Sequence, residues 1–508
     1  MVAFVLVPGH FTGGWIWRET GERLRAAGAE VYGATLDARP GAGLGTHIGD
    51  VLRLVDAVAD PELVLVGHDY GIHPVVGAAD RRAGRVSRVV HLDAGLPVDG
   101  DRALQLVPDR RARELLADPG TRPADGLLPA PGRQQWRRWG STAGLGRAEL
   151  GRLSDLATAQ PVASLVEPLR LSGAFRSVPT SGILCTAGGL STEAVEAMVH
   201  SGLERLRFLA DPRVGFFDLD TGHWPMLSCP RELADVLLRA AAGEGRRIAP
   251  PPAAVAGAFT RASVLDPPER PLPPCGHERA GSLDLYLPPD AGPGPVPAVL
   301  FVHGGPLPAD TRPGPRDWPL YVGYGRYAAS LGVVGATVAH GLHDLYAYPR
   351  AAGEVAAAVA ALRAHPRVDG GRIALWFFSG GGLLAADWLA APPPWLRCVA
   401  ASYPVLAPLP GWEAVEARFR PARAVAGAGG LPIVLVRAGL EAAAVARTVA
   451  GFVAAAAGSG AALEVVDVPQ GHHGFEVVDR TEEVREAVGR AAAAVLRQLW
   501  AGREPSGP

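Results

Sequence analysis

Short apolar runs alternate with longer amphipathic segments along most of the 508 residues. The apolar runs are rich in Val, Leu, Ile and Phe and end at Gly or at a polar residue, as buried strands do. The segments between them carry Ala, Leu and Arg at helical spacing. This alternation predicts the α/β class, with a mostly parallel sheet flanked by helices.

The strand candidates fall into two groups. The first group is 4–7, 31–35, 63–66, 86–92, 182–186 and 215–219. The second group is 283–287, 298–302, 333–338, 372–377, 398–403, 433–437 and 463–468. Within the first group, residues 97–180 are rich in Arg, Leu and Pro and contain no clear strand, so we expect a helical lid there.

The composition changes between the two groups, where residues 244–275 are rich in Pro and Ala, as a linker is. A chain of this length is also too long for one ordinary core. We therefore predict two α/β domains, at 1–243 and 276–500, joined by this linker, the first with a helical lid at about 97–180.

Composition narrows the class of protein further. The chain is 48% hydrophobic and 20% charged, as globular proteins are, and its net charge is -2. All 49 basic residues are Arg and are scattered among acidic ones, so we expect no nucleic-acid partner. The four cysteines lie far apart, which argues against a disulfide framework or a zinc site, and we expect no metal or cofactor.

The location of the protein is predicted from apolar segments. No apolar run approaches the ~20 residues that span a bilayer, and the first residues lack the basic start of a signal peptide. We therefore expect a cytoplasmic protein without a membrane partner. The sequence gives no indication of an oligomeric state.

Ser379 stands at the strongest candidate site of the second half. An apolar strand runs into Phe377-Phe378-Ser379-Gly380-Gly381-Gly382 and then into a helical segment. This strand, turn and helix pattern is that of a nucleophile elbow, which exposes a serine hydroxyl above the sheet. Gly381 fills the second Gly position of G-x-S-x-G, whereas Phe377 replaces the first.

Three further segments point to the same chemistry. His303-Gly304-Gly305-Pro306 follows a strand, where the N-H groups of Gly304 and Gly305, with that of Gly380, are expected to bind an oxyanion. We expect His303 to contact the substrate. Glu441 follows the 433–437 strand and His473 follows the 463–468 strand, giving the order nucleophile, acid, base.

This order predicts ester hydrolysis through an acyl-enzyme. His473 would take the Ser379 proton while Glu441 fixes the imidazole, and His472 is the rival base. Through HGGP, FFSGGG, GLE and GHHGF, residues 280–500 resemble the dienelactone-hydrolase-like and feruloyl-esterase-like esterases. The resemblance implies the same roles and a small-molecule ester as substrate.

The first half has an elbow of the same shape with a different residue at its apex. Leu63-Val64-Leu65-Val66-Gly67-His68-Asp69-Tyr70-Gly71 places Asp69 where a serine would stand. An aspartate nucleophile forms an alkyl ester by displacement, whereas serine transfers acyl groups. His223 lies where the base belongs, and Asp93 ends the 86–92 strand as a candidate acid.

Residues 1–243 resemble the esterase and hydroxynitrile-lyase-like branch of the α/β hydrolases, and GHDYG resembles the elbow of haloalkane dehalogenases and epoxide hydrolases. The resemblance implies Asp69 as nucleophile, His223 as base and Asp93 as acid. It also places Tyr70 at the oxyanion position, and His10 and Phe11 near the substrate. Two features differ: the lid contains no Tyr, and Tyr70 replaces the dehalogenase Trp.

Three functional hypotheses remain open from the sequence. The first is an esterase acting from Ser379, with a second site at Asp69. The second is a pseudo-hydrolase, in which the altered elbows mark both halves as binding or scaffold modules. The third gives the N-terminal half a dehalogenase, epoxide-hydrolase or lyase activity.

Overall fold

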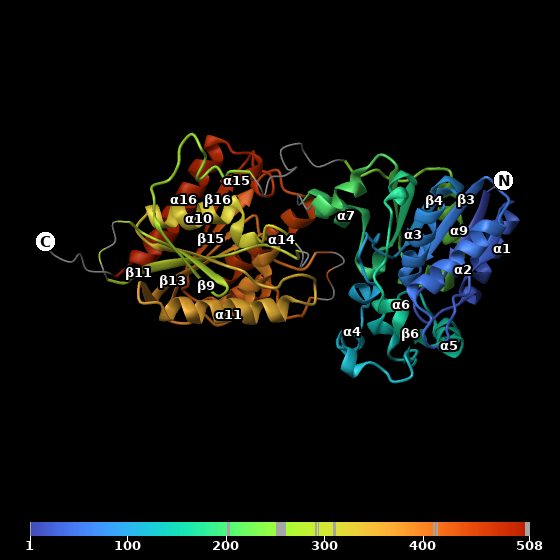
Figure 1. Ribbon diagram of the computed structural model, residues 1–508. Helices are drawn as coiled ribbons and strands as arrows, with labels where there is room; N and C mark the ends of the chain where they lie inside the picture. The colour runs from blue at the N-terminus through green and yellow to red at the C-terminus, as the bar shows by residue number, and fades with distance from the viewer. Residues whose placement is uncertain are drawn as a thin grey trace. The chain divides into compact units, whose positions relative to one another are not determined.

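The computed structural model describes residues 2–200, 204–249, 261–289, 292, 294–307, 311–409, 412 and 415–502. It divides into two compact units (Figure 1): unit 1 is Met1–Val195 with Phe208–Ala249, and unit 2 is Glu196–Arg207 with Pro250–Pro508. Of the predicted linker, residues 250–260 lie outside the described residues. Val264 and Leu265, also within it, are buried in a hydrophobic cluster of unit 2.

Unit 1 is built on a six-stranded sheet, in the order β2-β1-β3-β4-β7-β8, whose neighbours are all parallel. All six strand candidates of the first group are confirmed. Five of these strands are mostly buried and therefore appear as continuous apolar runs, whereas Glu30–Gly33 is partly exposed. The strands are β1 (Val2–Val7), β2 (Glu30–Gly33), β3 (Glu62–His68), β4 (Val86–Leu92), β7 (Thr180–Cys185) and β8 (Val214–Leu219).

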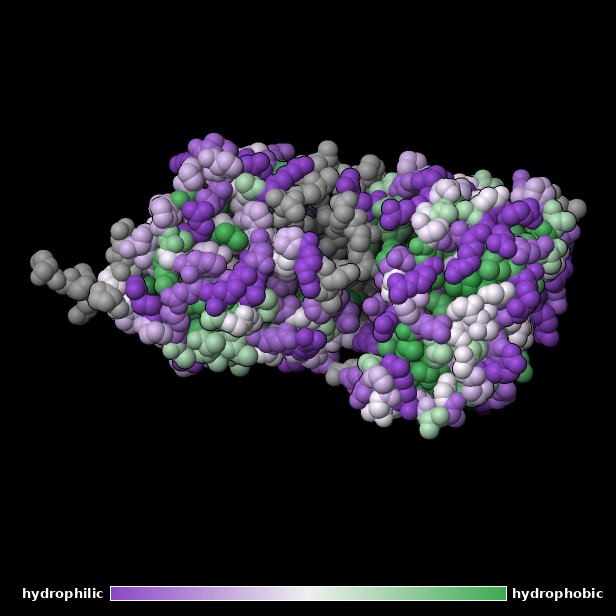
Figure 2. Space-filling view, in the orientation of Figure 1, coloured by the Kyte–Doolittle hydropathy of each residue, from purple (hydrophilic) through white to green (hydrophobic). Residues whose placement is uncertain are grey.

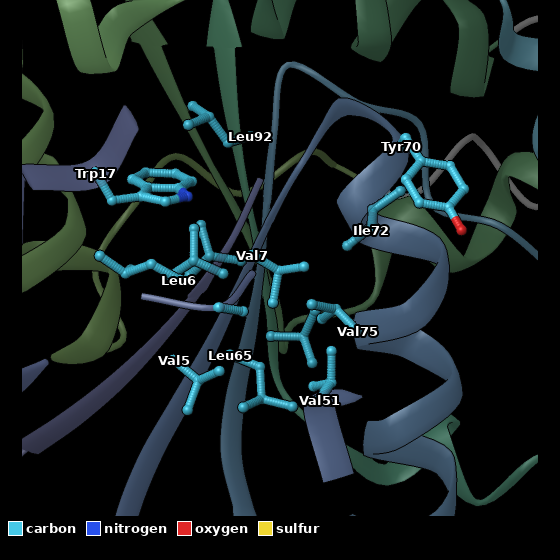
Figure 3. Packing of buried hydrophobic residues seen from close by; sticks show 14 of the residues in the cluster. Val5, Leu6, Val7, Trp17, Val51, Leu65, Tyr70, Ile72, Val75 and Leu92 are labelled. Atoms are coloured by element: carbon cyan, nitrogen blue, oxygen red, sulfur yellow. The ribbon is translucent and has the colours of Figure 1, made fainter. Parts of the chain in front are cut away.

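Helices cover this sheet, and their apolar faces join its side chains in one buried cluster. Figure 3 shows Ile72 and Val75 of α3 directed toward side chains of the sheet, among them Leu65. The helices are α1 (Arg18–Ala26), α2 (Leu44–Ala57), α3 (Ile72–Arg81), α8 (Pro225–Ser228) and α9 (Pro230–Ala241), and α7 (Thr192–His200) crosses the division between the units.

The segment expected as a helical lid contains three α-helices, α4 (Arg110–Ala117), α5 (Arg147–Asp155) and α6 (Val162–Val166). It also contains an antiparallel pair of strands, β5 (Leu127–Leu128) and β6 (Gln160–Pro161). The predicted helices of the lid are present, and the short strand pair was not predicted. Strands of two residues are too short to leave an apolar pattern in the sequence.

Unit 2 carries an eight-stranded sheet in the order β16-β15-β14-β13-β11-β12-β10-β9. It is parallel from β16 to β12, and β10 pairs antiparallel with both β12 and β9. The edge strand β9 was not predicted, because all five of its residues are exposed and it has no apolar alternation. The strands are β9 (Gly276–Ala280), β10 (Leu283–Leu287), β11 (Val296–Val302), β12 (Val334–Val338), β13 (Val368–Phe378), β14 (Leu396–Ser402), β15 (Ile433–Ala438) and β16 (Leu463–Val468).

Successive side chains of β13 serve opposite faces of this sheet, as the pleat requires. Phe377 packs in the cluster that contains α11 and α14, and Phe378 packs in the cluster that contains α10 and α16. Figure 1 shows α11 and α16 on opposite faces of the sheet. The helices are α10 (Pro319–Ser330), α11 (Tyr348–Ala364), α12 (Ala385–Ala390), α13 (Pro421–Ala424), α14 (Ala443–Ser459), α15 (Phe475–Val478) and α16 (Glu482–Trp500).

The structure confirms the predicted α/β class. The face in Figure 2 is mostly polar, with apolar residues scattered between polar ones. Among the described residues, no helix combines the length and apolar character needed to cross a bilayer.

Candidate active sites

Both units place a candidate site at the carboxyl ends of two paired strands. In unit 1, Val7 of β1 pairs with Gly67 of β3, and in unit 2, Val302 of β11 pairs with Phe377 of β13. Ligand sites of open α/β sheets lie at such strand ends. The shared register makes positions comparable between the two units.

Counting forward from these pairs gives two equivalences. Asp69 and Ser379 each stand two positions beyond the second strand's paired residue, and His10 and Gly305 each stand three positions beyond the first's. Asp69 has φ 49° and Ser379 has φ 51°. Both apices therefore lie in the left-handed region that non-glycine residues rarely adopt, as in a nucleophile elbow.

The unit 2 elbow leaves no space for a side chain at Gly304. A Cβ there would stand 2.8 Å from Cβ and 3.3 Å from Oγ of Ser379. Both distances are shorter than ordinary contacts between such atoms. Glycine at this position therefore lets the loop after β11 approach the Ser379 hydroxyl.

Ser379, His473 and Glu441 form a continuous hydrogen-bonded relay. Oγ of Ser379 lies 2.7 Å from Nε2 of His473, and Nδ1 of His473 lies 2.7 Å from Oε2 of Glu441. Burial alone would lower the pKa of His473, but the Glu441 carboxylate outweighs burial and raises it. A histidine oriented in this way can accept the serine proton and later return it.

His472, the rival base, is engaged elsewhere. Its Nδ1 lies 2.7 Å from Oδ1 of Asp479, and its backbone N-H donates to the same carboxylate. Its side chain is 34% exposed, against 14% for His473. The geometry therefore favours His473 as the base.

The predicted oxyanion donors of the loop after β11 differ in whether they are already hydrogen-bonded within the fold. The N-H of Gly304 donates to the Tyr321 hydroxyl at 3.3 Å, so this N-H is already engaged within the fold. In unit 1, the N-H of His10 donates to Oδ2 of Asp69 at 3.1 Å. The backbone amide at this position of the loop is therefore the one directed toward the apex residue. The equivalent amide in unit 2 is that of Gly305, and Gly380 follows the serine directly.

His303, expected to contact substrate, uses its ring inside the protein. Its Nδ1–H donates to the Gly304 carbonyl at 2.6 Å, and its Nε2 accepts the His340 N-H at 3.4 Å. Its ring stacks on that of His340 at 3.6 Å, and burial lowers the pKa of His303 to about 4. The neutral His303 ring, with both of its nitrogens hydrogen-bonded, holds the loop in place. No sequence pattern pointed to His340.

Sequence reasoning also missed Glu476, three residues after His473. This carboxyl is fully buried, and Oε1 accepts a hydrogen bond from the Tyr324 hydroxyl at 2.6 Å. Burial raises the pKa of Glu476 to about 7. Tyr403, whose φ is 36°, places its ring 4.8 Å from that of His473. Tyr324 and Glu476 are 152 positions apart in the chain, so no sequence pattern pairs them.

In unit 1, the Asp69 carboxylate is held through one oxygen. Oδ2 accepts from the N-H of His10 at 3.1 Å and lies 2.5 Å from Nδ1 of the same histidine. Burial acts to raise the pKa of Asp69, but His10 and His223 hold it well below its usual range. Within the described part of the chain, Oδ1 has no hydrogen bond, and the side chain is 14% exposed. The two contacts with His10 therefore fix the orientation of this carboxylate.

His223 lies between two carboxylates. Its Nδ1 is 2.6 Å from Oδ2 of Asp93, and its Nε2 is 3.7 Å from Oδ2 of Asp69. Burial lowers the pKa of His223, but the two carboxylates outweigh burial and raise it to about 10. His223 is therefore an imidazolium at neutral pH.

A cavity of about 250 Å³ opens at Asp69, lined by His10, Tyr70, His73, Asp93 and His223 together with lid residues. The Tyr70 hydroxyl lies 2.7 Å from Nδ1 of His47 and so bonds within the fold. Phe11 is buried against Trp139, with ring centroids 4.6 Å apart, and its N-H donates to Oε1 of Gln160 at 3.4 Å. Gln160 was not anticipated from the sequence.

The lid rests directly on the loop that carries His223. The N-H of His223 donates to the Ser141 carbonyl at 2.8 Å. A Cβ added to Gly140 would stand 2.5 Å from Cβ and Cγ of His223, so only glycine fits there. The lid therefore fixes the position of His223 and closes one side of the cavity.

With this geometry in view, comparisons with known proteins are informative. A carbendazim-hydrolysing esterase of Nocardioides sp. (strain SG-4G) is 38% identical over 128 residues, 23% of this chain and 52% of that protein. The chain thus spans about half the length of this curated relative.

Solved structures share low identity with the chain. An extracellular alpha/beta-hydrolase from a Paenibacillus species is 19% identical, covering 47% of this chain and 99% of its own, with a TM-score of 0.37. Polyneuridine aldehyde esterase is 20% identical, covering 47% and 99%, with a TM-score of 0.36. Residues 4–236 match the alpha/beta hydrolase family, so this segment carries the fold of that family.

Proposed function

We propose that the protein hydrolyses a small-molecule ester through an acyl-enzyme on Ser379. The observation that carries this proposal is the unbroken relay from Ser379 through His473 to Glu441, with 2.7 Å at both contacts. A relay of this order, on a strained apex at the end of a central strand, is what nucleophilic catalysis by serine requires.

In the first step, Nε2 of His473 takes the proton of Ser379, and Oγ attacks the ester carbonyl carbon. The N-H groups of Gly305 and Gly380 stabilise the oxyanion, and Glu441 stabilises the imidazolium. His473 then gives its proton to the departing alcohol. A water molecule, activated by His473, releases the acid in the second step.

Unit 1 supports a different reaction as a second candidate. Oδ2 of Asp69 already occupies the N-H of His10, the donor that an acyl oxyanion would need. Asp69 instead lines the cavity, where its carboxylate can displace a leaving group at saturated carbon. Esterification removes the charge of Asp69, which lowers the pKa of His223 and lets this histidine act as the base on the water that hydrolyses the ester.

The test of the first candidate is covalent labelling with a fluorophosphonate, followed by intact mass spectrometry and peptide mapping. We expect one adduct, on Ser379, in the wild type and in Ser330→Ala, a matched serine of α10 whose hydroxyl bonds only the Tyr327 carbonyl. Ser379→Ala should carry no adduct and should lose turnover of short-chain aryl esters.

An adduct that persists in Ser379→Ala, or a wild type that neither labels nor turns over esters, would reject the proposal. Carbendazim, the substrate in the name of the 38% identical relative, belongs in the same ester panel. Turnover of carbendazim that survives Ser379→Ala would assign ester hydrolysis to another site.

A further inference from the structure

The cavity of unit 1 contains buried polar atoms that nothing in the fold satisfies. Nε2 of His10 and both ring nitrogens of His73 have no hydrogen-bond partner among the described residues. The two side chains are 4% and 1% exposed, and both line the cavity. The Tyr70 carbonyl lies near the His73 ring, but no hydrogen bond of normal geometry joins them. Buried polar atoms left unpaired cost free energy, so a ligand that pairs them is favoured.

The free nitrogens define the hydrogen-bonding groups that a ligand needs. Nδ1 of His10 is engaged with Oδ2 of Asp69, and Nε2 is left without a partner among the described residues. Burial lowers the pKa of His73 to about 4, so this ring is neutral near pH 7 and offers one acceptor nitrogen. An O-H or N-H group on the ligand complements this acceptor.

The charges around the cavity disfavour an ionic ligand. Oδ2 of Asp69 contacts His10 and Oδ2 of Asp93 contacts His223, so a cation would have to displace these contacts. An anion would meet these two carboxylates, and the N-H of His10 is already bound to Asp69. A charged ligand would also lose its hydration beside the apolar lid residues Ala103, Leu106 and Pro108.

The walls and the volume favour a single aromatic ring. The rings of His10 and Trp139 lie 5.3 Å apart, and the rings of Tyr70 and His73 are stacked at 6.2 Å. The volume of about 250 Å³ is below the roughly 300–1,000 Å³ of pockets for drug-sized ligands.

We propose that this cavity binds a small, uncharged aromatic compound with an O-H or N-H group, which donates to His73 while its ring packs against Trp139. This inference concerns binding in unit 1. It goes beyond the ester hydrolysis proposed for Ser379 and does not depend on it.

The test is isothermal titration of the full chain at pH 7.5 with four probes of similar size: phenol, toluene, benzoate and benzylamine. We expect phenol to bind about 5- to 10-fold more tightly than toluene, which is the gain of one hydrogen bond. Benzoate and benzylamine should bind more weakly than phenol. Tighter binding of either ion, equal binding of phenol and toluene, or no binding of any probe would overturn the proposal.

Two variants locate the binding. His73→Phe keeps a buried ring and removes both nitrogens, so it should reduce the advantage of phenol over toluene. Leu106→Trp enlarges a cavity-lining side chain that is 47% exposed, so it should fold and should exclude all probes. Phenol binding unchanged by Leu106→Trp would place the ligand elsewhere and reject the proposal. Labelling of Ser379 reports on unit 2 and probe binding reports on unit 1, so failure of either proposal is recognised separately.

Discussion

The two units offer two solutions at one position of the same scaffold. In unit 2, His473 contacts one carboxylate, that of Glu441, and one hydroxyl, that of Ser379. In unit 1, His223 lies between the carboxylates of Asp69 and Asp93. The two sites therefore differ in the number of carboxylates around the histidine as well as in the apex residue.

The two elbows also differ in how soon a helix follows the apex. In unit 1, α3 begins at Ile72, and a Cβ on Gly67 would stand 2.6 Å from Cα of Ile72. In unit 2, the 3-10 segment Ser379–Leu384 follows the apex, and α12 begins only at Ala385. The later start of the helix explains how Phe377 replaces the glycine of this motif and is fully buried.

The largest expected effect is on ester turnover, and it distinguishes His473 from its neighbour His472. His473→Gln should lower ester turnover by roughly 10³-fold or more, because Ser379 loses its base. His472→Gln is the matched control, and turnover should change little, because His472 bonds Asp479 and not Ser379. Steady-state kinetics of both variants on one aryl ester decide the point. Equal losses in the two variants would contradict the assignment of the base.

The next effect concerns stability in unit 2. The pKa of Glu476 is about 7 in the fold, above its ordinary value of 4.5, so the folded chain binds a proton that the unfolded chain releases between these pH values. Stability should therefore fall as pH rises from about 4.5 to about 7, by on the order of 3 kcal/mol. Urea unfolding across this range measures the slope. Glu476→Gln should flatten it, and an unchanged slope would refute the account.

A smaller effect is expected at the close approach beneath Ser379. Gly304→Ala should reduce ester turnover by up to roughly 100-fold, because its Cβ must displace Ser379 or the loop. Gly353→Ala is the matched control: it lies in α11 with no atom within 4 Å of the added Cβ. That variant should keep its activity and gain about 0.5–1 kcal/mol in unfolding free energy. Comparable losses of turnover in both variants would contradict the steric explanation.

The smallest expected effect concerns the pKa of His223. Asp69→Asn removes one of the two carboxylates beside His223, so the pKa of His223, about 10 in the wild type, should fall by roughly one to three pH units. Histidine resonances followed by NMR between pH 6 and 10 measure this shift. The His473 resonance serves as the internal reference, since its carboxylate partner is Glu441. Titration of His223 near pH 6.5 in the wild type would contradict the expected effect of the two carboxylates on its pKa.

The local pattern of apolar residues was sufficient to predict most strands of the two sheets. Apolar runs marked every strand of the unit 1 sheet and seven strands of the unit 2 sheet. Most of these strands are buried on both faces and therefore need apolar side chains at successive positions, although β2 and β16 are partly exposed. The exposed edge strand Gly276–Ala280 and the two-residue strands of the lid lacked that requirement and were missed.

For the site, the sequence by itself determined the residue types and their order: Asp69 and Ser379 at the apices of Gly-containing turns, and Glu441 before His473. Only the tertiary structure decided which groups meet. It turned His473 toward Ser379, gave the Gly304 N-H to Tyr321, joined His10 to Asp69 and enclosed Glu476 with Tyr324. These contacts join residues 17 to 152 positions apart. They depend on how distant strand ends and loops pack together, which no local periodicity encodes.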